Sequence, residues 1–370
     1  MRMILATALL CAGASSGHAE ADHAAIARAS LTEVIRPFYA ALAEQTGALT
    51  GKIETLCGQP SAAALNETKT AFAATVSAWS KVEILGFGPV TQDHRYERLF
   101  FWPDPKGLGL RQVQEVLANK DQSVELPDEL ADKSVALQGL PALEYLLYGD
   151  GAEALAKERQ IVGGEESPPE VEEIGAFRCG FALSVATNID RMARNVVEGW
   201  REGAAYEKSF LGPVLDDPHY HAPKEVTLDL FKAFTSGIEL VRDQKLAKPL
   251  GASSEQAKPK LAAFWRSGLS FANAAGNLEG VRALFAQGGF ARVAAVESPG
   301  VESSILFDLD HAIEVLRGID TPMAEVVGDE SLRAKLEALR VSLKSARDTA
   351  GDLIARGAGL AFGFNAMDGD

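Results

Sequence analysis

The sequence is short of basic residues for its size. It has 36 lysines and arginines against 51 aspartates and glutamates, which gives a formal net charge of −15. Nucleic-acid and anionic-membrane surfaces need clustered Lys and Arg to displace counterions, so this balance argues against both kinds of partner. A protein with this acidic charge is better suited to bind cations or basic ligands. Intrinsic disorder is excluded because 47% of the residues are hydrophobic.

Signatures of the common enzyme classes are missing as well. The sequence has no His-Glu-x-x-His zinc motif and no Cys-x-x-Cys-His motif for haem attachment. No nucleophile elbow or glycine-rich phosphate loop lies beside any of its six histidines, so a Ser/His/Asp triad cannot be argued. A zinc peptidase needs about three protein ligands and an open position for water. Without a zinc motif, the sequence gives no such set of ligands.

The N-terminus has the features of an export signal. A positively charged start precedes an apolar run from Ile4 to Ala14, and Gly17-His18-Ala19 supplies the small residues that signal peptidase accepts. We expect residues 1–19 to be removed and the mature chain to be periplasmic. The run is shorter than the ~20 residues that span a bilayer, so no transmembrane segment is expected. Lipid attachment at Cys11 is the alternative, and Leu10 before it fits that signal poorly.

Cysteine is scarce, with three in the whole sequence. Removal of the export signal takes away Cys11 and leaves Cys57 and Cys179. Two cysteines in an oxidising compartment usually pair. We therefore expect a disulfide that joins the end of the first helix to the start of the second half, with two buried free thiols as the alternative.

Strand-like alternation is nowhere sustained, and apolar residues recur instead at steps of three, four and seven. The stretch from Ile26 to Leu56 shows this pattern. Many of the expected helices exceed twenty residues, or about 30 Å, and helices of that length pack as bundles. Further helices are expected at 61–84, 111–119, 128–148, 170–201, 224–244, 254–287, 300–317 and 329–356.

Length and helix breakers indicate two domains. At roughly 150 residues per domain, a chain of 370 residues suggests two. The polar stretch Gly163–Pro169 cannot continue a helix and is the best boundary. The sequence therefore predicts an all-α fold of two long-helix bundles, each resembling a four-helix bundle, at 20–165 and 166–370.

The segment from Gln138 to Gly149 carries the most specific motif. It resembles the Gly-x-His-x-x-Glu-Tyr-Leu-Leu-(aromatic)-Gly segment of the imelysin-like family. Supporting matches follow the order of that family along the chain: Phe87-Gly88-Pro89, Phe101-Trp102-Pro103-Asp104, Lys248-Pro249-Leu250-Gly251, and the C-terminal stretch from Gly363 to Asp370. The resemblance implies two related helical bundles, an envelope location and a link to iron or haem acquisition. Some members have been classed as metallopeptidases.

One position departs from the family pattern. Pro141 stands where the family has histidine, and proline offers no side-chain donor to a metal. His and Glu at i and i+3 can chelate together, whereas Glu144 alone is a weak site. The resemblance still makes Glu144 the first candidate ligand, with Trp102 and Asp104 as its neighbours. For Asp104 the alternative is a structural role in capping a turn.

A second candidate site lies in the C-terminal half. His311 and Glu314 repeat the spacing of Pro141 and Glu144 at an offset of 170 residues, which suggests internal duplication. Asp308, His311 and Glu314 fall near one helix face, so we hypothesise that they bind a divalent cation, iron or zinc. A solvated helix face with a single histidine is the alternative.

Two acidic stretches are weaker metal candidates. The loop 216–221 combines carboxylates with two histidines, and Asp368-Gly369-Asp370 ends the chain. Polar loops between long helices are often merely solvated, and chain ends usually fray.

Three functions stay open on this evidence. The first is a non-enzymatic periplasmic protein of iron or haem uptake, which binds a cation or an envelope partner in the cleft between the bundles. A metal-dependent peptidase of the imelysin type is the second. The third is a metal-free member that acts only through protein contacts, and Pro141 favours it.

Overall fold

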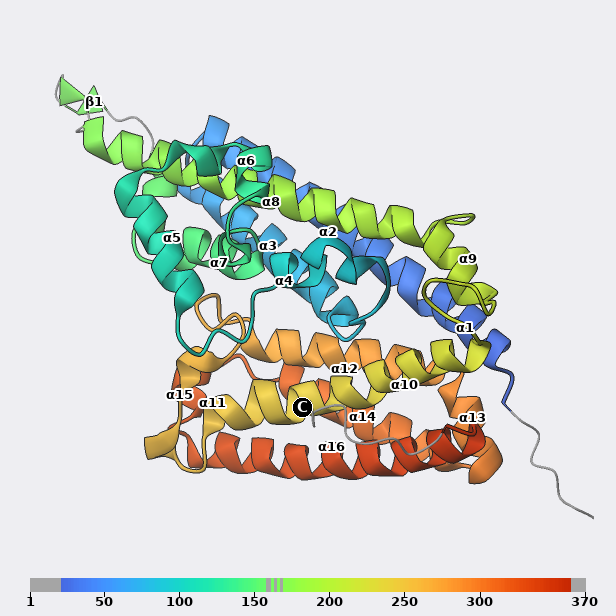
Figure 1. Ribbon diagram of the computed structural model, residues 1–370. Helices are drawn as coiled ribbons and strands as arrows, with labels where there is room; N and C mark the ends of the chain where they lie inside the picture. The colour runs from blue at the N-terminus through green and yellow to red at the C-terminus, as the bar shows by residue number, and fades with distance from the viewer. Residues whose placement is uncertain (1–20, 158–160, 163–164, 167–168, 361–370) are drawn as a thin grey trace, which may run out of the picture.

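The structure, a computed structural model, describes residues 21–157, 161–162, 165–166 and 169–360, and helices dominate it (Figure 1). In these ranges the only strands are β1 (Ile161–Val162) and β2 (Glu165–Glu166), which pair antiparallel. The prediction of an all-α fold is therefore confirmed. The expected export signal and the C-terminal acidic stretch lie outside the described residues.

The first helical layer is built on three long helices. These are α2 (Arg36–Gly58), α3 (Ala62–Val82) and α8 (Pro169–Trp200), and α2 packs against both of the others. The π-helical η1 (Leu31–Ile35) joins α1 (His23–Ser30) to α2. Short elements complete the layer: η2 (Gly88–His94), α4 (Arg95–Leu99), α5 (Leu108–Asn119), η3 (Gln122–Glu125), α6 (Pro127–Ala131), η4 (Val135–Leu137), α7 (Leu140–Tyr148), η5 (Ala152–Ala156) and α9 (Ala205–Leu211).

The second layer lies beneath the first in Figure 1, in yellow to red. Its long helices are α10 (Pro223–Glu239), α12 (Ser270–Ala286), α14 (Val301–Arg317) and α16 (Glu330–Gly357), and α12 also packs against α3 of the first layer. Its shorter elements are the π-helical η6 (Leu240–Ala247), α11 (Lys248–Leu250), η7 (Ser254–Gln256), η8 (Pro259–Leu261), α13 (Phe290–Glu297) and α15 (Met323–Val326).

Local sequence signals fix where several of these helices start. The side chains of Asp22, Ser61 and Asp329 each accept a hydrogen bond from a backbone N–H in the first turn of α1, α3 and α16. Such N-caps satisfy amide groups that have no partner inside the helix. The apolar faces then pack into one core, in which Trp79, Phe72 and Phe234 are fully buried.

The expected domain boundary after residue 165 stays a prediction. Helix α8 follows that position, yet it packs chiefly against α2 in the first layer. The helices of the second layer begin with α10. The proposed internal duplication also stays a prediction. The two helices that carry its motifs differ in length, since α7 spans Leu140–Tyr148 and α14 spans Val301–Arg317.

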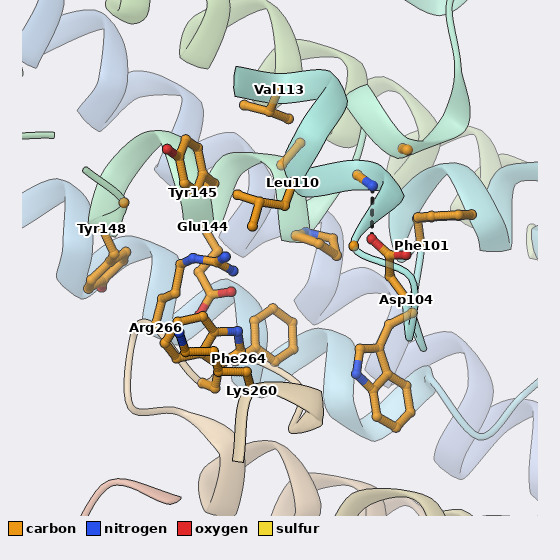
Figure 2. A pocket seen from close by; sticks show the side chains of 18 of the residues that line it. Phe101, Asp104, Leu110, Val113, Glu144, Tyr145, Tyr148, Lys260, Phe264 and Arg266 are labelled. Atoms are coloured by element: carbon orange, nitrogen blue, oxygen red, sulfur yellow. Dashed lines mark hydrogen bonds between the residues drawn. The ribbon is translucent and has the colours of Figure 1, made fainter. Parts of the chain in front are cut away.

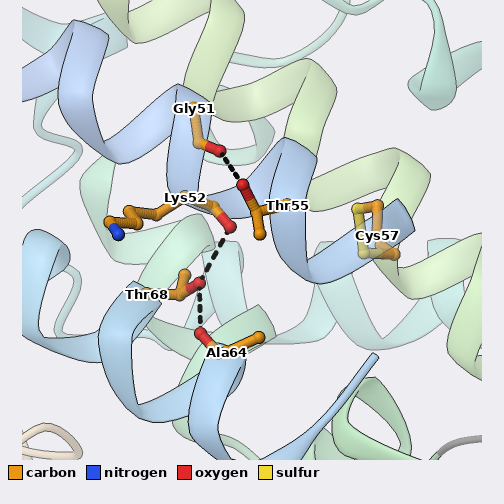
Figure 3. Close-up of a disulfide and its surroundings, with 7 residues drawn as sticks. Gly51, Lys52, Thr55, Cys57, Ala64 and Thr68 are labelled. Atoms are coloured by element: carbon orange, nitrogen blue, oxygen red, sulfur yellow. Dashed lines mark hydrogen bonds between the residues drawn. A yellow bond between two sulfur atoms is a disulfide. The ribbon is translucent and has the colours of Figure 1, made fainter. Parts of the chain in front are cut away.

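A disulfide joins Cys57 at the end of α2 to Cys179 in α8, as expected (Figure 3). Their Cα atoms are 5.6 Å apart although 122 residues separate them in sequence. Beside the bridge, the Thr68 hydroxyl of α3 donates to the carbonyl of Lys52 on α2 at 3.2 Å. The end of α2 is thus held from two sides.

Two of the expected helices are wrong in extent. The stretch 128–148 forms α6, η4 and α7 instead of one helix, and α7 begins anew with Gly139 as its N-cap and Pro141 in its first turn. In the stretch 254–287 the long helix α12 begins only at Ser270, and the preceding residues form a loop that contains the short 3-10 elements η7 and η8. None of the helices in the described ranges is both long and apolar enough to span a membrane.

Candidate binding pocket

The candidate site is a pocket of about 570 Å³ at the junction of the two layers (Figure 2). The segment 100–109, α5 and α7 of the first layer form one side, and residues 260–266 of the second layer form the other. Its walls are rich in aromatic rings. These belong to Phe100, Phe101, Trp102, Tyr145, Tyr148, Phe264 and Trp265.

The loop 251–269 brings the second layer to this pocket. Gly251 and Gly268 bound it with φ values of 62° and 74°, a region that favours glycine. The indole N–H of Trp102 donates to the carbonyl of Leu261 at 3.1 Å, and the ring of Phe264 stacks on Phe100 with centroids 5.1 Å apart. These contacts dock the loop on the first layer.

Glu144 lies on α7 at the base of the pocket and is 3% exposed. Its Oε1 accepts hydrogen bonds from the backbone N–H and the hydroxyl of Ser267, both at 2.8 Å. Burial raises the pKa of the Glu144 carboxyl above its ordinary value, while the bonds from Ser267 and the charge of Arg266 oppose this rise. The carboxylate therefore ties α7 to the docked loop.

Helix α7 itself is held at its C-terminal end by Arg178 of α8. The guanidinium donates to the carbonyls of Leu146 at 2.7 Å, Tyr145 at 2.8 Å and Asp150 at 2.8 Å. Cations stabilise a helix C-terminus because its last carbonyls lack partners inside the helix. This contact fixes the position of Glu144 and Tyr145.

Asp104 lines the same pocket, but its carboxylate caps α5. Its two oxygens accept the backbone N–H groups of Leu108 and Gly109, each at 2.8 Å. This capping contact is the structural role that the sequence analysis gave as the alternative to metal binding by Asp104. Trp102 forms part of the wall, and Pro141 lines the pocket as well.

Two cations line the pocket from the docked loop. The Arg266 guanidinium lies 4.3 Å from the ring centroid of Trp265 and 5.3 Å from that of Tyr145, and Figure 2 shows it beside Glu144. The Lys260 ammonium lies 5.5 Å from the centroid of Trp265. Burial lowers the pKa of Arg266, and the nearby Glu144 opposes this shift.

The second predicted group does not reach the pocket. His311 and Glu314 are exposed on α14, Asp308 is half-buried, and the His311 ring stacks on the exposed Phe307. None of the three lines the pocket. Over the described ranges, no three His, Cys, Asp or Glu side chains converge as a metal site would require. The cation site proposed on α14 therefore stays a prediction.

Polar side chains of the loop 216–221 bond to the loop backbone and to neighbouring residues. Asp217 accepts the backbone N–H of His219 at 2.8 Å and the hydroxyl of Ser209. His221 pairs at 3.4 Å with the exposed Glu225. These contacts explain the loop without a metal.

Sequence reasoning missed Lys260 and Arg266 as pocket residues and Ser267 as the partner of Glu144. They lie in a stretch that was expected to be helical, and no motif marks them. The available signal was compositional, since Phe264-Trp265-Arg266 places two aromatic residues beside a cation between Pro259 and Gly268.

Comparisons with known proteins agree with this architecture. The sequence model of the imelysin family, which is designated a peptidase family, matches residues 35–349. An imelysin-like protein from Psychrobacter arcticum 273-4 superposes with a TM-score of 0.70 at 16% identity, over 92% of this chain and 97% of that one. An iron-regulated protein A precursor from Parabacteroides distasonis ATCC 8503 superposes with a TM-score of 0.72 at 14% identity and the same coverage. No curated protein sequence matches significantly.

Proposed function

This chain belongs to the imelysin family, and from that membership and its pocket we propose a non-enzymatic role in iron or haem uptake. In this proposal the protein is exported to the periplasm and binds its ligand in the pocket between the two layers, together with envelope components of the uptake system. The observation that carries the proposal is the place of the family motif, since Glu144 and Pro141 line a pocket to which both layers contribute.

The pocket is suited to an organic ligand. Its volume of about 570 Å³ is within the range of roughly 300–1,000 Å³ that is usual for small-molecule sites, and aromatic side chains dominate its wall. A haem or another organic iron carrier is a ligand of this kind. The iron-regulated name of one structural neighbour supports this direction.

The side chains around the pocket do not fit a bare metal ion. Pro141 has no donor atom, both oxygens of Asp104 are bonded to the α5 backbone, and Oε1 of Glu144 is bonded to Ser267. A catalytic zinc needs about three protein ligands together with a bound water. We therefore derive no peptidase mechanism for this chain.

The proposal is tested by titrating residues 20–370 with haem, ferrous iron and zinc under anaerobic conditions. We expect saturable haem binding, seen as a shift of the haem absorbance band, and weak binding of both bare ions. Pro141→Trp should fill the pocket and weaken haem binding at least about ten-fold, which corresponds to about 1.4 kcal/mol. Val341→Trp, on the exposed face of α16, is the matched control.

Equal haem affinity in Pro141→Trp and the wild type would overturn the pocket as the binding site. Stoichiometric zinc binding together with peptide cleavage would instead favour a metallopeptidase. If none of the three ligands binds, the proposal fails and the metal-free, partner-binding function takes its place.

A further inference from the structure

The charged side chains around the pocket differ in whether they have hydrogen-bond partners. Glu144 and Asp104 are both hydrogen-bonded to backbone N–H groups, and Asp150 lies exposed at the rim. The Arg266 guanidinium and the Lys260 ammonium have ring contacts, and neither side chain donates a hydrogen bond or forms an ion pair with another described residue. The Glu144 carboxylate lies near Arg266 and its charge acts on the guanidinium, although the two do not form an ion pair. Oε1 of Glu144 and both oxygens of Asp104 are thus engaged, while the two cationic side chains keep their donors.

The setting of Arg266 favours recognition of a carboxylate. Its guanidinium packs near the rings of Trp265 and Tyr145, and these contacts leave its N–H donors available. A guanidinium presents its donors in a planar fork that matches a carboxylate with two parallel hydrogen bonds. The half-buried position strengthens such bonds relative to those at an open surface.

We propose that the pocket binds an organic anion, with a flat apolar body against the aromatic wall and a carboxylate paired with Arg266. Lys260 adds positive charge at the exposed side of the docked loop. The inference rests on the proposed function, because it assumes that this pocket is the binding site. It goes further by naming the chemistry of the ligand and the residue that selects it.

The test compares two probes that share a naphthalene body and carry opposite charges. Residues 20–370 are titrated calorimetrically with 2-naphthoate and with 2-naphthylmethylamine. We expect the carboxylate to bind at least about ten-fold more tightly than the amine. Arg266→Gln should weaken naphthoate binding about ten-fold or more, since a charged hydrogen-bonded pair is lost. Lys258→Gln, an exposed lysine of the same loop outside the pocket, is the control and should bind as the wild type does.

A second variant guards against a folding defect. Arg266→Lys keeps the charge but loses the planar fork, so it should bind naphthoate with intermediate affinity and melt at the wild-type temperature. Tighter binding of the amine, or unchanged naphthoate affinity in Arg266→Gln, would overturn the inference.

The two proposals fail in different ways. If naphthoate does not bind while Pro141→Trp still weakens haem binding, the anion inference fails and the proposed function stands. If Pro141→Trp affects neither titration, both proposals fail.

Discussion

At the scale of single residues, Glu144 is the most constrained acid of the pocket. It is buried, and its Oε1 accepts two hydrogen bonds from Ser267. These bonds compensate only part of the cost of burying the charge, since the net effect is a raised pKa. The Glu144 carboxylate thus connects the two layers.

This raised pKa predicts a pH dependence of stability. A carboxyl with a higher pKa in the folded state binds more protons when folded, so its contribution falls as pH rises from the unfolded value through the folded one. The free energy of unfolding of the wild type, relative to Glu144→Gln, should therefore fall as pH is raised from 4 upward. Chemical denaturation of both proteins across this range measures the difference.

Glu67→Gln provides a control of opposite sign. Lys52 lowers the pKa of the exposed Glu67, so the wild type should gain stability relative to this variant as pH rises. If Glu144→Gln followed the same trend as Glu67→Gln, the assignment of Glu144 as a net desolvated carboxyl would be wrong.

At the scale of elements, a buried ion pair joins α3 to the π-helical η6. The Lys245 ammonium donates to the two carboxylate oxygens of Glu83, directly after α3, at 2.7 and 2.9 Å. Asn273 and Asn277 of α12 also donate to Glu83, at 3.0 and 2.9 Å. The Lys245 ammonium further lies 4.7 Å from the ring centroid of Trp102, so this network supports the pocket wall.

Removal of one partner should be strongly destabilising. Lys245→Met leaves the Glu83 carboxylate buried without its cation, and such losses cost about 3–5 kcal/mol. Urea unfolding should show a decrease of this size, and the double variant Lys245→Met/Glu83→Gln should recover much of it. Lys52→Met breaks the exposed pair with Glu67 and should change stability far less, because solvent screens that pair. Equal effects at the two lysines would contradict this account.

At the scale of the whole molecule, the disulfide closes a long segment of the chain. Cys57 and Cys179 are 122 residues apart, and the segment between them contains α3 and the whole α7 side of the pocket. A cross-link of this span restricts the unfolded chain and typically contributes about 2–5 kcal/mol.

We therefore expect Cys57→Ala/Cys179→Ala to unfold at lower denaturant concentration than the wild type. The predicted loss in free energy of unfolding is about 2–5 kcal/mol, measured under oxidising conditions. The wild type in reducing buffer should shift in the same direction, whereas the double variant should not respond to reductant. A wild type that is equally stable with and without reductant would disprove the stabilising role of the bridge.

The sequence by itself determined the helical class, the cysteine pair and the family. Helical periodicity, N-cap residues and paired cysteines are local or compositional signals, so they can be recognised without knowing the contacts. Glu144 could be identified because a contiguous motif surrounds it. Asp104 lines the same pocket, but its carboxylate caps α5.

Only the tertiary structure decided what these residues contact. Residues 254–269 were expected to be helical as part of the stretch 254–287, but Pro259, the left-handed glycines and docking of Phe264 on Phe100 override the apolar pattern. Its residues Arg266 and Ser267 meet α7 across more than a hundred positions in sequence, as the Ser267 bond to Glu144 shows. Periodicity describes how one helix faces its surroundings, but it carries no information about which distant segment covers that face.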